Sequence, residues 1–235
     1  MLRVGGPREG RRSVWSPPLT VPGLLSLVLL LAVAVAMVDV LGYAFRRLGL
    51  GPGWATVVLL VSLLGGGLNI PIRELRGTPT AGLATVRWFG VSYLVPVIQR
   101  PRTILAVNVG GALVPVALSM YLILHGHLYA DATVAVALVA VPVHLAARPL
   151  RGVGIAVPVL LPPLAALSVA VLLHPTAVAA LAYVGGTLGT LVGADLTHLP
   201  AAVALDAPVV AIGGAGTFDG IFVTGVLAVL LTGLL

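Results

Sequence analysis

Long apolar runs, separated by short polar segments, make up most of the chain. Each run is about as long as a helix needs to be to cross a hydrocarbon core of about 30 Å. Apolar and polar residues do not alternate within the runs, as they would in a membrane β-strand. The pattern therefore predicts an all-α fold, a polytopic transmembrane helical bundle of about seven spans. The expected spans are residues 21–45, 54–70, 104–124, 132–147, 154–173, 176–194 and 218–235.

The segment between the second and third runs differs in character. Residues 71–103 carry six charged side chains, and their central part mixes Trp88, Phe89 and Tyr93 with β-branched residues. The segment is too charged to span a membrane, whereas Trp and Tyr favour the level of the lipid headgroups. The pattern predicts an amphipathic interfacial segment between spans two and three.

The segment before the last run is almost as apolar as the spans themselves. Residues 199–217 contain Asp206 as their only charged residue. Since a loop in water is usually more polar than this, we expect a re-entrant or buried, strand-like segment between spans six and seven. Such a segment would bring the ends of these two spans together.

The N-terminal end is polar. Residues 1–20 hold four arginines, and we expect them to form a cytoplasmic tail that precedes a single transmembrane domain, residues 21–235. Charge followed by an apolar run also occurs in signal peptides, and Ala34-Val35-Ala36 resembles a cleavage site. Because the first run is long for a signal peptide, we favour a retained helix, with a cleaved signal as the alternative.

Composition and charge support a membrane location. Hydrophobic residues make up 59% of the chain and charged residues 9%, whereas soluble domains carry about 25% charged residues. All 13 basic residues are Arg, and most lie in residues 1–20, 71–103 and 148–151. With seven spans these segments share one side, which the positive-inside rule assigns to the cytoplasm. We predict a multi-pass protein of the cell membrane with a cytoplasmic N-terminus, and the lipid bilayer, not nucleic acid, as its partner.

Two aspartates carry the candidate chemistry. Asp195 follows Gly193-Ala, and Asp219 lies in Gly216-Thr217-Phe-Asp-Gly220, each at the edge of an apolar run. An ionisable group at membrane depth costs several kcal/mol and usually faces a cavity or a partner. Two carboxyl groups brought close can share a proton, so that one acts as general base and the other as acid. We predict both aspartates as catalytic. Helix capping or binding of backbone N–H groups is the alternative.

Further polar or small residues are expected to line or support this site. They are Asp39, Asn69, Asn108, His198, Gly193, Gly216, Thr217 and Gly220. For Asn108, a hydrogen bond between helices is the favoured alternative.

Several histidines are candidate metal ligands. His198 follows Asp195 by one helical turn, so the two could share a metal or form an ion pair. His125, His127 and His144 are further candidates. A full site needs three or four ligands, and no local cluster supplies them. We therefore predict no metal and no cofactor. The chain has no Cys, which excludes thiol catalysis and Cys-based metal sites.

Four motifs resemble an uncharacterised family of prokaryotic multi-pass membrane proteins, known as a domain of unknown function. The motifs are Asn69-Ile-Pro71, Asn108-Val-Gly-Gly111-Ala-Leu-Val-Pro115, Gly193-Ala-Asp195-Leu and Gly214-Ala-Gly-Thr-Phe-Asp-Gly-Ile-Phe-Val-Thr-Gly225. This resemblance covers about residues 25–235 and implies no activity.

The two aspartates on consecutive spans also resemble, more weakly, intramembrane aspartyl proteases of the presenilin and signal-peptide-peptidase type. That resemblance implies a di-aspartate protease. Ala194 and Phe218 stand where those proteases have Tyr and Gly, and a later helix with Pro-Ala-Leu is missing.

Three functions are consistent with these residues. The first is a di-aspartate intramembrane protease that uses Asp195 and Asp219 on a membrane-embedded peptide. The second is a proton- or ion-coupled transporter of a small solute, with Asp39 and Asn108 on the path. The third is a non-enzymatic scaffold that binds anionic lipid through its arginines. The oligomeric state is left open.

Overall fold

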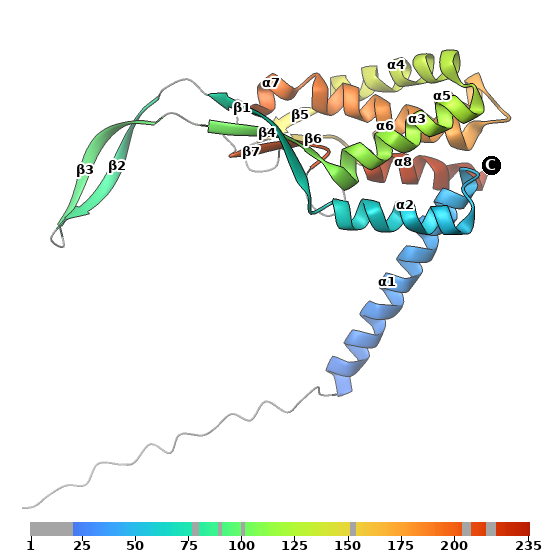
Figure 1. Ribbon diagram of the computed structural model, residues 1–235, viewed down its shortest axis with the longest axis horizontal. Helices are drawn as coiled ribbons and strands as arrows, with labels where there is room; N and C mark the ends of the chain where they lie inside the picture. The colour runs from blue at the N-terminus through green and yellow to red at the C-terminus, as the bar shows by residue number, and fades with distance from the viewer. Residues whose placement is uncertain are drawn as a thin grey trace, which may run out of the picture. The chain divides into compact units, whose positions relative to one another are not determined.

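The computed structural model divides into two compact units, Met1–Val40 and Leu41–Leu235 (Figure 1). The described residues are 21–76, 80–88, 91–99, 102–150, 154–203, 208–214 and 220–235. The expected polar tail, residues 1–20, lies outside them. Helix α1 (Val21–Arg47) covers the first expected span. Its residues up to Val40 belong to the first unit, and Asp39 is exposed there.

The second unit is mostly helical. Its helices are α2 (Pro52–Gly65), α3 (Val114–Gly126), α4 (Tyr129–Ala146), α5 (Leu161–Leu173), α6 (Val178–Thr190), α7 (Leu199–Val203) and α8 (Gly220–Leu231). A π-helical turn, η1 (Val109–Leu113), leads into α3, and a second, η2 (Leu191–Leu196), continues α6. A short 3-10 helix, η3 (Thr232–Leu234), follows α8.

Three helical segments of the described residues are long and apolar enough to cross a membrane: Val109–Gly126, Tyr129–Ala146 and Val178–Leu196. Shorter apolar helices are Gly53–Gly65, Leu161–Leu173 and Gly220–Thr232. The apolar helices agree with the expected membrane protein, but the expectation of seven spans is not confirmed. Several runs are shorter as helices because their ends are strands, loops or turns.

Helix α6 lies at the centre of the bundle, where it contacts α3, α4, α5 and α8. The segment that contains it is 61% buried, against 22% for the segment of α4. Glycines spaced by four residues make this packing close. A Cβ on Gly185 would lie 3.3 Å from Ala135 Cβ, and one on Gly189 would lie 2.7 Å from Val139 Cβ. This is the small-residue contact by which membrane helices approach each other.

The chain is not all-α, which corrects the expectation from sequence. The strands are β1 (Asn69–Arg76), β2 (Thr80–Trp88), β3 (Val91–Gln99), β4 (Arg102–Asn108), β5 (Arg148–Leu150), β6 (Gly154–Ala156) and β7 (Val209–Ile212). The described parts of the segment expected to be interfacial, residues 71–103, therefore form strands, and β2 pairs antiparallel with β3. Its many β-branched and aromatic residues favour extended backbone.

One sheet of three strands adjoins the helices, with the order β1-β4-β7. Strand β1 pairs antiparallel with β4, and β7 pairs parallel with β4. Pro71 lies beside a register shift in β1, as suits a residue without an N–H group in an edge strand. Of the segment 199–217, expected to be re-entrant or buried and strand-like, Val209–Ile212 forms strand β7, whereas Leu199–Val203 forms helix α7.

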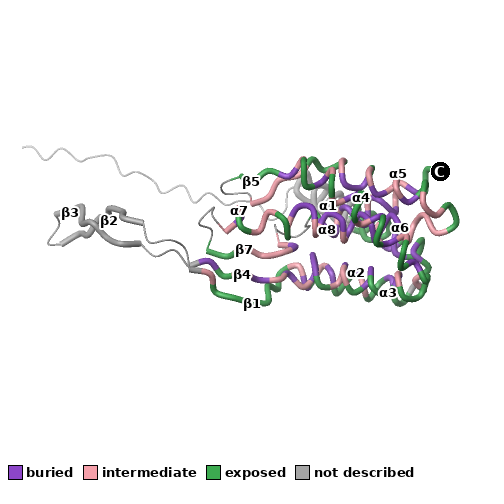
Figure 2. Tube along the Cα trace, turned by 90° about the horizontal axis from the view of Figure 1, so that it is seen from above, coloured by how far each residue is buried: buried purple, intermediate pink, exposed green. Residues whose placement is uncertain are grey.

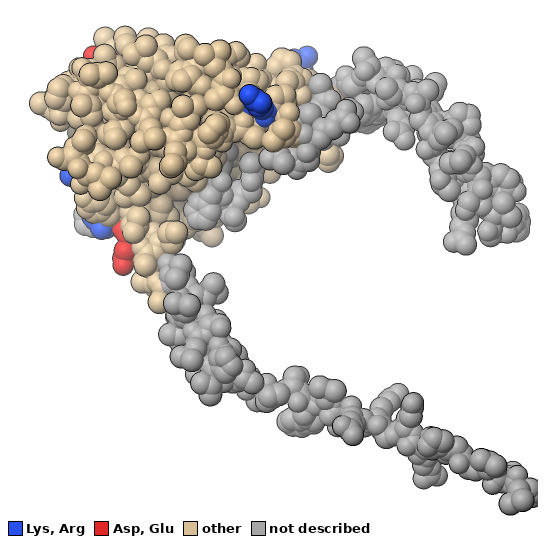
Figure 3. Space-filling view, turned by 180° about the vertical axis from the view of Figure 1, so that it is seen from behind, with Lys and Arg blue, Asp and Glu red and all other residues tan. Residues whose placement is uncertain are grey.

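Buried and exposed residues divide as expected for a bundle in lipid. The core centres on α6, and the outer helices alternate between buried and exposed positions (Figure 2). Large apolar side chains on the outside are freely accessible, among them Leu64, Leu145 and Leu172, which are 76%, 77% and 82% exposed. On the face that Figure 3 shows, the charged side chains of the described residues are few and scattered. A surface this apolar favours lipid over water as its surroundings.

Candidate functional site

The sheet ends where η1 begins, and polar residues meet there. Asn69 in β1 lies opposite Asn108 in β4. Val107 pairs with Ile212 of β7, so Gly213 follows β7 at the level at which Asn108 ends β4. The antiparallel and parallel pairings thus bring three distant segments to one edge, beside η1. π-Helical turns of this kind occur frequently at functional sites.

Asn108 links the segments at this edge by hydrogen bonds. It is 2% exposed. Its Nδ2 donates to the carbonyl oxygen of Gly66 at 2.8 Å and to Asn69 Oδ1 at 3.0 Å. Its Oδ1 accepts from the N–H of Gly111 at 2.7 Å and so caps η1. Asn108 therefore has structural hydrogen bonds, which it shares with Asn69, but they join strands, a turn and η1, whereas the favoured alternative was a bond between helices.

Glycines let the backbone segments approach at this edge. A Cβ on Gly110 would overlap the carbonyl oxygen of Ser62 in α2. Gly213 has φ of +71°, and a Cβ on it would lie 2.7 Å from the backbone nitrogen of Ala112. Side chains other than hydrogen would push η1 away from α2 or β7, so these positions require glycine.

Asp195, which belongs to η2, also lies at this edge of the sheet. It lies in η2, at the end of the segment Val178–Leu196, and is partly buried. Its Oδ2 accepts a hydrogen bond of 2.8 Å from the N–H of Gly213. Oδ1 makes no hydrogen bond with the described part of the chain. The carboxyl group is therefore held in place through Oδ2.

The remaining expected site residues are placed as follows. Gly193 is buried against α4, where a Cβ would lie 2.5 Å from the carbonyl oxygen of Ala140. Gly220 begins α8 and is exposed, with open space around it. Asp219, Gly216 and Thr217 lie outside the described residues. The pairing of Asp195 with Asp219 thus stays a prediction.

His198 lies with His144 of α4. The ring centroids are 4.7 Å apart. Both Nδ1 atoms contact the hydroxyl of Thr197, at 2.9 Å for His144 and 3.1 Å for His198. No group of three or more metal-binding side chains occurs among the residues that the structure describes. The sequence offered His144 and His198 only as separate candidates, because they are 54 positions apart. Thr197, which contacts both rings, was not among the residues expected at a site.

A family model for a protein of unknown function, DUF1614, matches residues 63–231. The chain belongs to the DUF1614 family. No curated protein and no solved structure matches the chain. The resemblance to an uncharacterised membrane family is thereby confirmed, whereas the similarity to presenilin-type proteases is not shown.

The matched DUF1614 region begins near the end of α2 and ends at Leu231, the last residue of α8. It includes the three-stranded sheet, both π-helical turns and Asp195. Helix α1 lies before it. The site at the edge of the sheet therefore belongs to the part of the chain that defines the family.

Proposed function

We propose that this DUF1614 protein is an intramembrane hydrolase that cleaves peptide bonds with Asp195 and Asp219. One observation carries the proposal: the Asp195 carboxyl group is anchored by Oδ2 to the turn at Gly213, from which the chain leads to Asp219 within six residues. Anchoring one oxygen keeps the other pointing in a fixed direction, as acid–base catalysis requires.

The packing of α8 on α6 supports a short distance between the two aspartates. Gly225 of α8 packs against Thr187 of α6, and the two helices run in opposite directions, with the C-terminus at the end away from the sheet (Figure 1). At about 1.5 Å per residue, Asp195 lies about 12 Å from the level of the contact between Gly225 and Thr187, in the direction of the sheet. Gly220 lies about 8 Å from that level in the same direction. The start of α8 is therefore within about one helical turn of Asp195 in height.

The chemistry needs one proton between two carboxyl groups. The ionised aspartate takes a proton from water, whose oxygen attacks the peptide carbonyl carbon, and the protonated aspartate donates to the carbonyl oxygen. As the resulting gem-diol collapses, one of its hydroxyl groups returns a proton to the second aspartate and the C–N bond breaks. The nitrogen leaves as an amine with a proton from the first aspartate. The substrate is a peptide segment in the membrane, and the protein lies in the cell membrane with a cytoplasmic N-terminus.

The distance can be tested directly because the chain has no native cysteine. The double variant Asp195→Cys/Asp219→Cys in membranes should be joined by a short bifunctional reagent that alkylates thiols, since two carboxyl groups one water apart place their Cβ atoms within its reach. The matched control is Asp131→Cys/Asp219→Cys, because Asp131 lies in the first turn of α4. Equal cross-linking in both pairs, or none in the first, would contradict the proposal.

Activity is the second test. The purified protein in lipid nanodiscs should cleave single-span peptides, with products read by mass spectrometry. Asp195→Asn retains an oxygen that accepts the Gly213 N–H, so the fold should persist while cleavage is lost. Asp219→Asn should give the same result. Undiminished cleavage by either variant would refute the assignment.

A second candidate function is a proton- or ion-coupled carrier, which buried hydroxyl groups favour. The hydroxyls of Thr187 and Thr190 in α6 and of Ser119 in α3 are buried without a hydrogen-bond partner among the described residues. Such a group costs about 1–3 kcal/mol unless water or an ion satisfies it. We expect Thr187→Val/Thr190→Val to lower pH-driven flux in liposomes, whereas Thr133→Val, at an exposed hydroxyl bonded to the carbonyl oxygen of Tyr129, should not. Equal flux in both variants would exclude this function.

A further inference from the structure

Three of the helices that expose apolar side chains are short for a membrane protein. Helices α2, α3 and α5 contain 14, 13 and 13 residues. Each exposes large apolar side chains, for example Leu64 in α2, Leu124 in α3 and Leu172 in α5. At about 1.5 Å per residue these helices are about 20 Å long, whereas the hydrocarbon core of a typical bilayer is about 30 Å thick.

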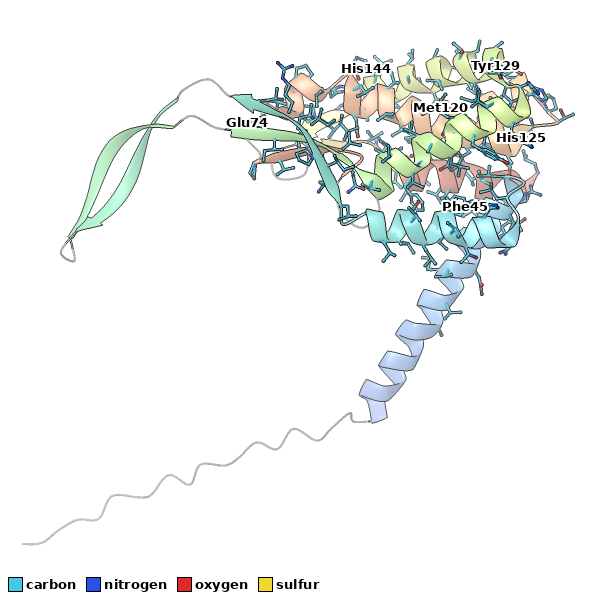
Figure 4. All side chains as sticks on the ribbon, viewed as in Figure 1. Phe45, Glu74, Met120, His125, Tyr129 and His144 are labelled. Atoms are coloured by element: carbon cyan, nitrogen blue, oxygen red, sulfur yellow. The ribbon has the colours of Figure 1, made fainter. Side chains whose placement is uncertain are left out.

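Helix α4 is longer, with 18 residues, but it carries an ionisable side chain in each of its end turns. Asp131 lies in the first turn, 3.9 Å from His174 Nε2, and His144 lies in the last turn. Figure 4 shows Tyr129, the first residue of α4, at one end of the helices and His144 at the other. Asp131 and His144 are 13 positions apart, which is about 20 Å along the helix. Since ionisable groups are costly in hydrocarbon, the lipid tails beside α4 fit between these two levels.

The three-stranded sheet marks the same boundary at its end of the helices. Strand β1 is an edge strand of the order β1-β4-β7, and it carries the exposed Arg73 and Glu74. An open sheet edge does not occur in contact with hydrocarbon, because its N–H and C=O groups would lack partners there. The turn η1 joins the sheet to α3, and its Gly110, Gly111 and Ala112 are buried, so it adds little surface for lipid. The hydrocarbon therefore ends before the sheet begins.

We propose that the lipid partner of this DUF1614 protein is a thin bilayer. Its outer helices fit a hydrocarbon core of about 20 Å, so the protein prefers phospholipids with short acyl chains and thins a bilayer of longer ones around itself. Tilting does not relieve this mismatch, because it accommodates only a helix that is longer than the hydrocarbon. The proposal rests on helix lengths and on the polar groups at helix ends, so it does not depend on the proposed cleavage.

The first test locates the two levels at which the hydrocarbon ends. Because the chain has no native cysteine, single cysteines can be placed at exposed positions of α4: Ala130→Cys and Leu145→Cys near its ends, and Leu138→Cys in the middle. The full chain is studied in nanodiscs of dioleoyl phosphatidylcholine, which are open on both faces, with a charged methanethiosulfonate reagent. We expect both end cysteines to react at least about tenfold faster than the middle one, because charge is excluded from hydrocarbon.

A second helix offers a matched series. Leu160→Cys and Leu172→Cys lie near the two ends of α5, and Ser168→Cys lies between them, all at exposed positions. We expect the same order of reaction rates, with the middle cysteine slowest. Circular dichroism establishes that each variant is folded, and only folded variants are compared.

The second test measures the preferred thickness with the unchanged chain. Its thermal unfolding is followed by circular dichroism in nanodiscs of dimyristoleoyl, dioleoyl and dierucoyl phosphatidylcholine, whose acyl chains increase in length in that order. We expect the midpoint temperature to fall as the chains lengthen, since each added ångström of mismatch costs free energy. Dilauroyl phosphatidylcholine is the control: its chains are short but saturated, so a high midpoint there attributes the effect to thickness.

Two results would overturn the proposal. One is an end cysteine of folded α4 and α5 variants that reacts as slowly as the middle cysteine in dioleoyl nanodiscs, which would place that end inside the hydrocarbon. The other is a midpoint temperature that stays constant or rises as the acyl chains lengthen, which would show that the protein fits a bilayer of ordinary thickness.

Discussion

Replacement of Asn108 by alanine should cost more stability than loss of an ordinary buried polar group. The side chain is 2% exposed and makes hydrogen bonds to Gly66, Asn69 and Gly111. Truncation removes all three and leaves the carbonyl of Gly66 and the N–H of Gly111 without this partner. One side chain thus joins β1, η1 and the end of α2 by hydrogen bonds.

The magnitude follows from the count of these bonds. A net hydrogen bond contributes about 0.5–1.5 kcal/mol in proteins generally and about 0.6 kcal/mol on average between membrane helices. Three bonds therefore give about 2–4 kcal/mol of unfolding free energy. At a pH where its new carboxyl group is neutral, Asn108→Asp keeps an oxygen that accepts from Gly111 and has one O–H donor in place of the two N–H donors. We therefore expect an intermediate loss.

The control is Ser119→Ala. Ser119 is as buried as Asn108, with 0% exposure, but its hydroxyl has no hydrogen-bond partner among the described residues. Its removal should change stability by less than about 0.5 kcal/mol or stabilise the protein, because no bond is lost. The assay is unfolding in mixed micelles with increasing SDS, followed by circular dichroism. Equal losses in Asn108→Ala and Ser119→Ala would refute the reasoning.

Other predictions concern glycine and aromatic packing. Gly213→Ala should cost about 2–4 kcal/mol, because φ of +71° is unfavourable for alanine and the new Cβ would meet η1; an unchanged melting temperature would contradict this. Gly225→Ala should also destabilise, since its Cβ would overlap the hydroxyl of a threonine in α6, whereas Gly220→Ala, with open space around it, should not; thermal unfolding of the two variants decides. Phe45→Ala should cost about 3–5 kcal/mol, since its ring is 0% exposed and packs 6.3 Å from that of Phe222; a smaller loss in SDS titration would indicate that the core collapses around the gap.

The helices were the part of the fold that the sequence could predict. Helix α1 and the segment Tyr129–Ala146 lie almost where the apolar runs place them. Hydropathy succeeds here because backbone groups in lipid must be satisfied within the helix itself. Hydropathy failed at the ends of the runs. Residues 104–108, for example, are as apolar as the residues of a membrane helix but belong to strand β4. An apolar run does not distinguish a buried strand from a helix.

The candidate site was predictable in its residue types but not in its contacts. Asp195, Asn69 and Asn108 could be proposed as site residues from the sequence, because polar groups are costly in an apolar run. Their partners could not be predicted, since the hydrogen bond to Gly213 depends on the parallel pairing of β7 with β4. Pairings between segments about 100 residues apart leave no local pattern in the sequence.

The amino-acid sequence by itself determined that this DUF1614 protein is built from apolar helices, because its composition allows no large water-facing surface. It also determined where close backbone contacts are tolerated, since its glycines recur at helical spacing. Only the tertiary structure decided which elements share those contacts. It brought β1, β4 and β7 to one edge, joined Asp195 to Gly213, and placed His198 beside His144. The reason is physical: hydropathy acts on each segment alone, whereas hydrogen bonds and ring contacts require two segments to meet.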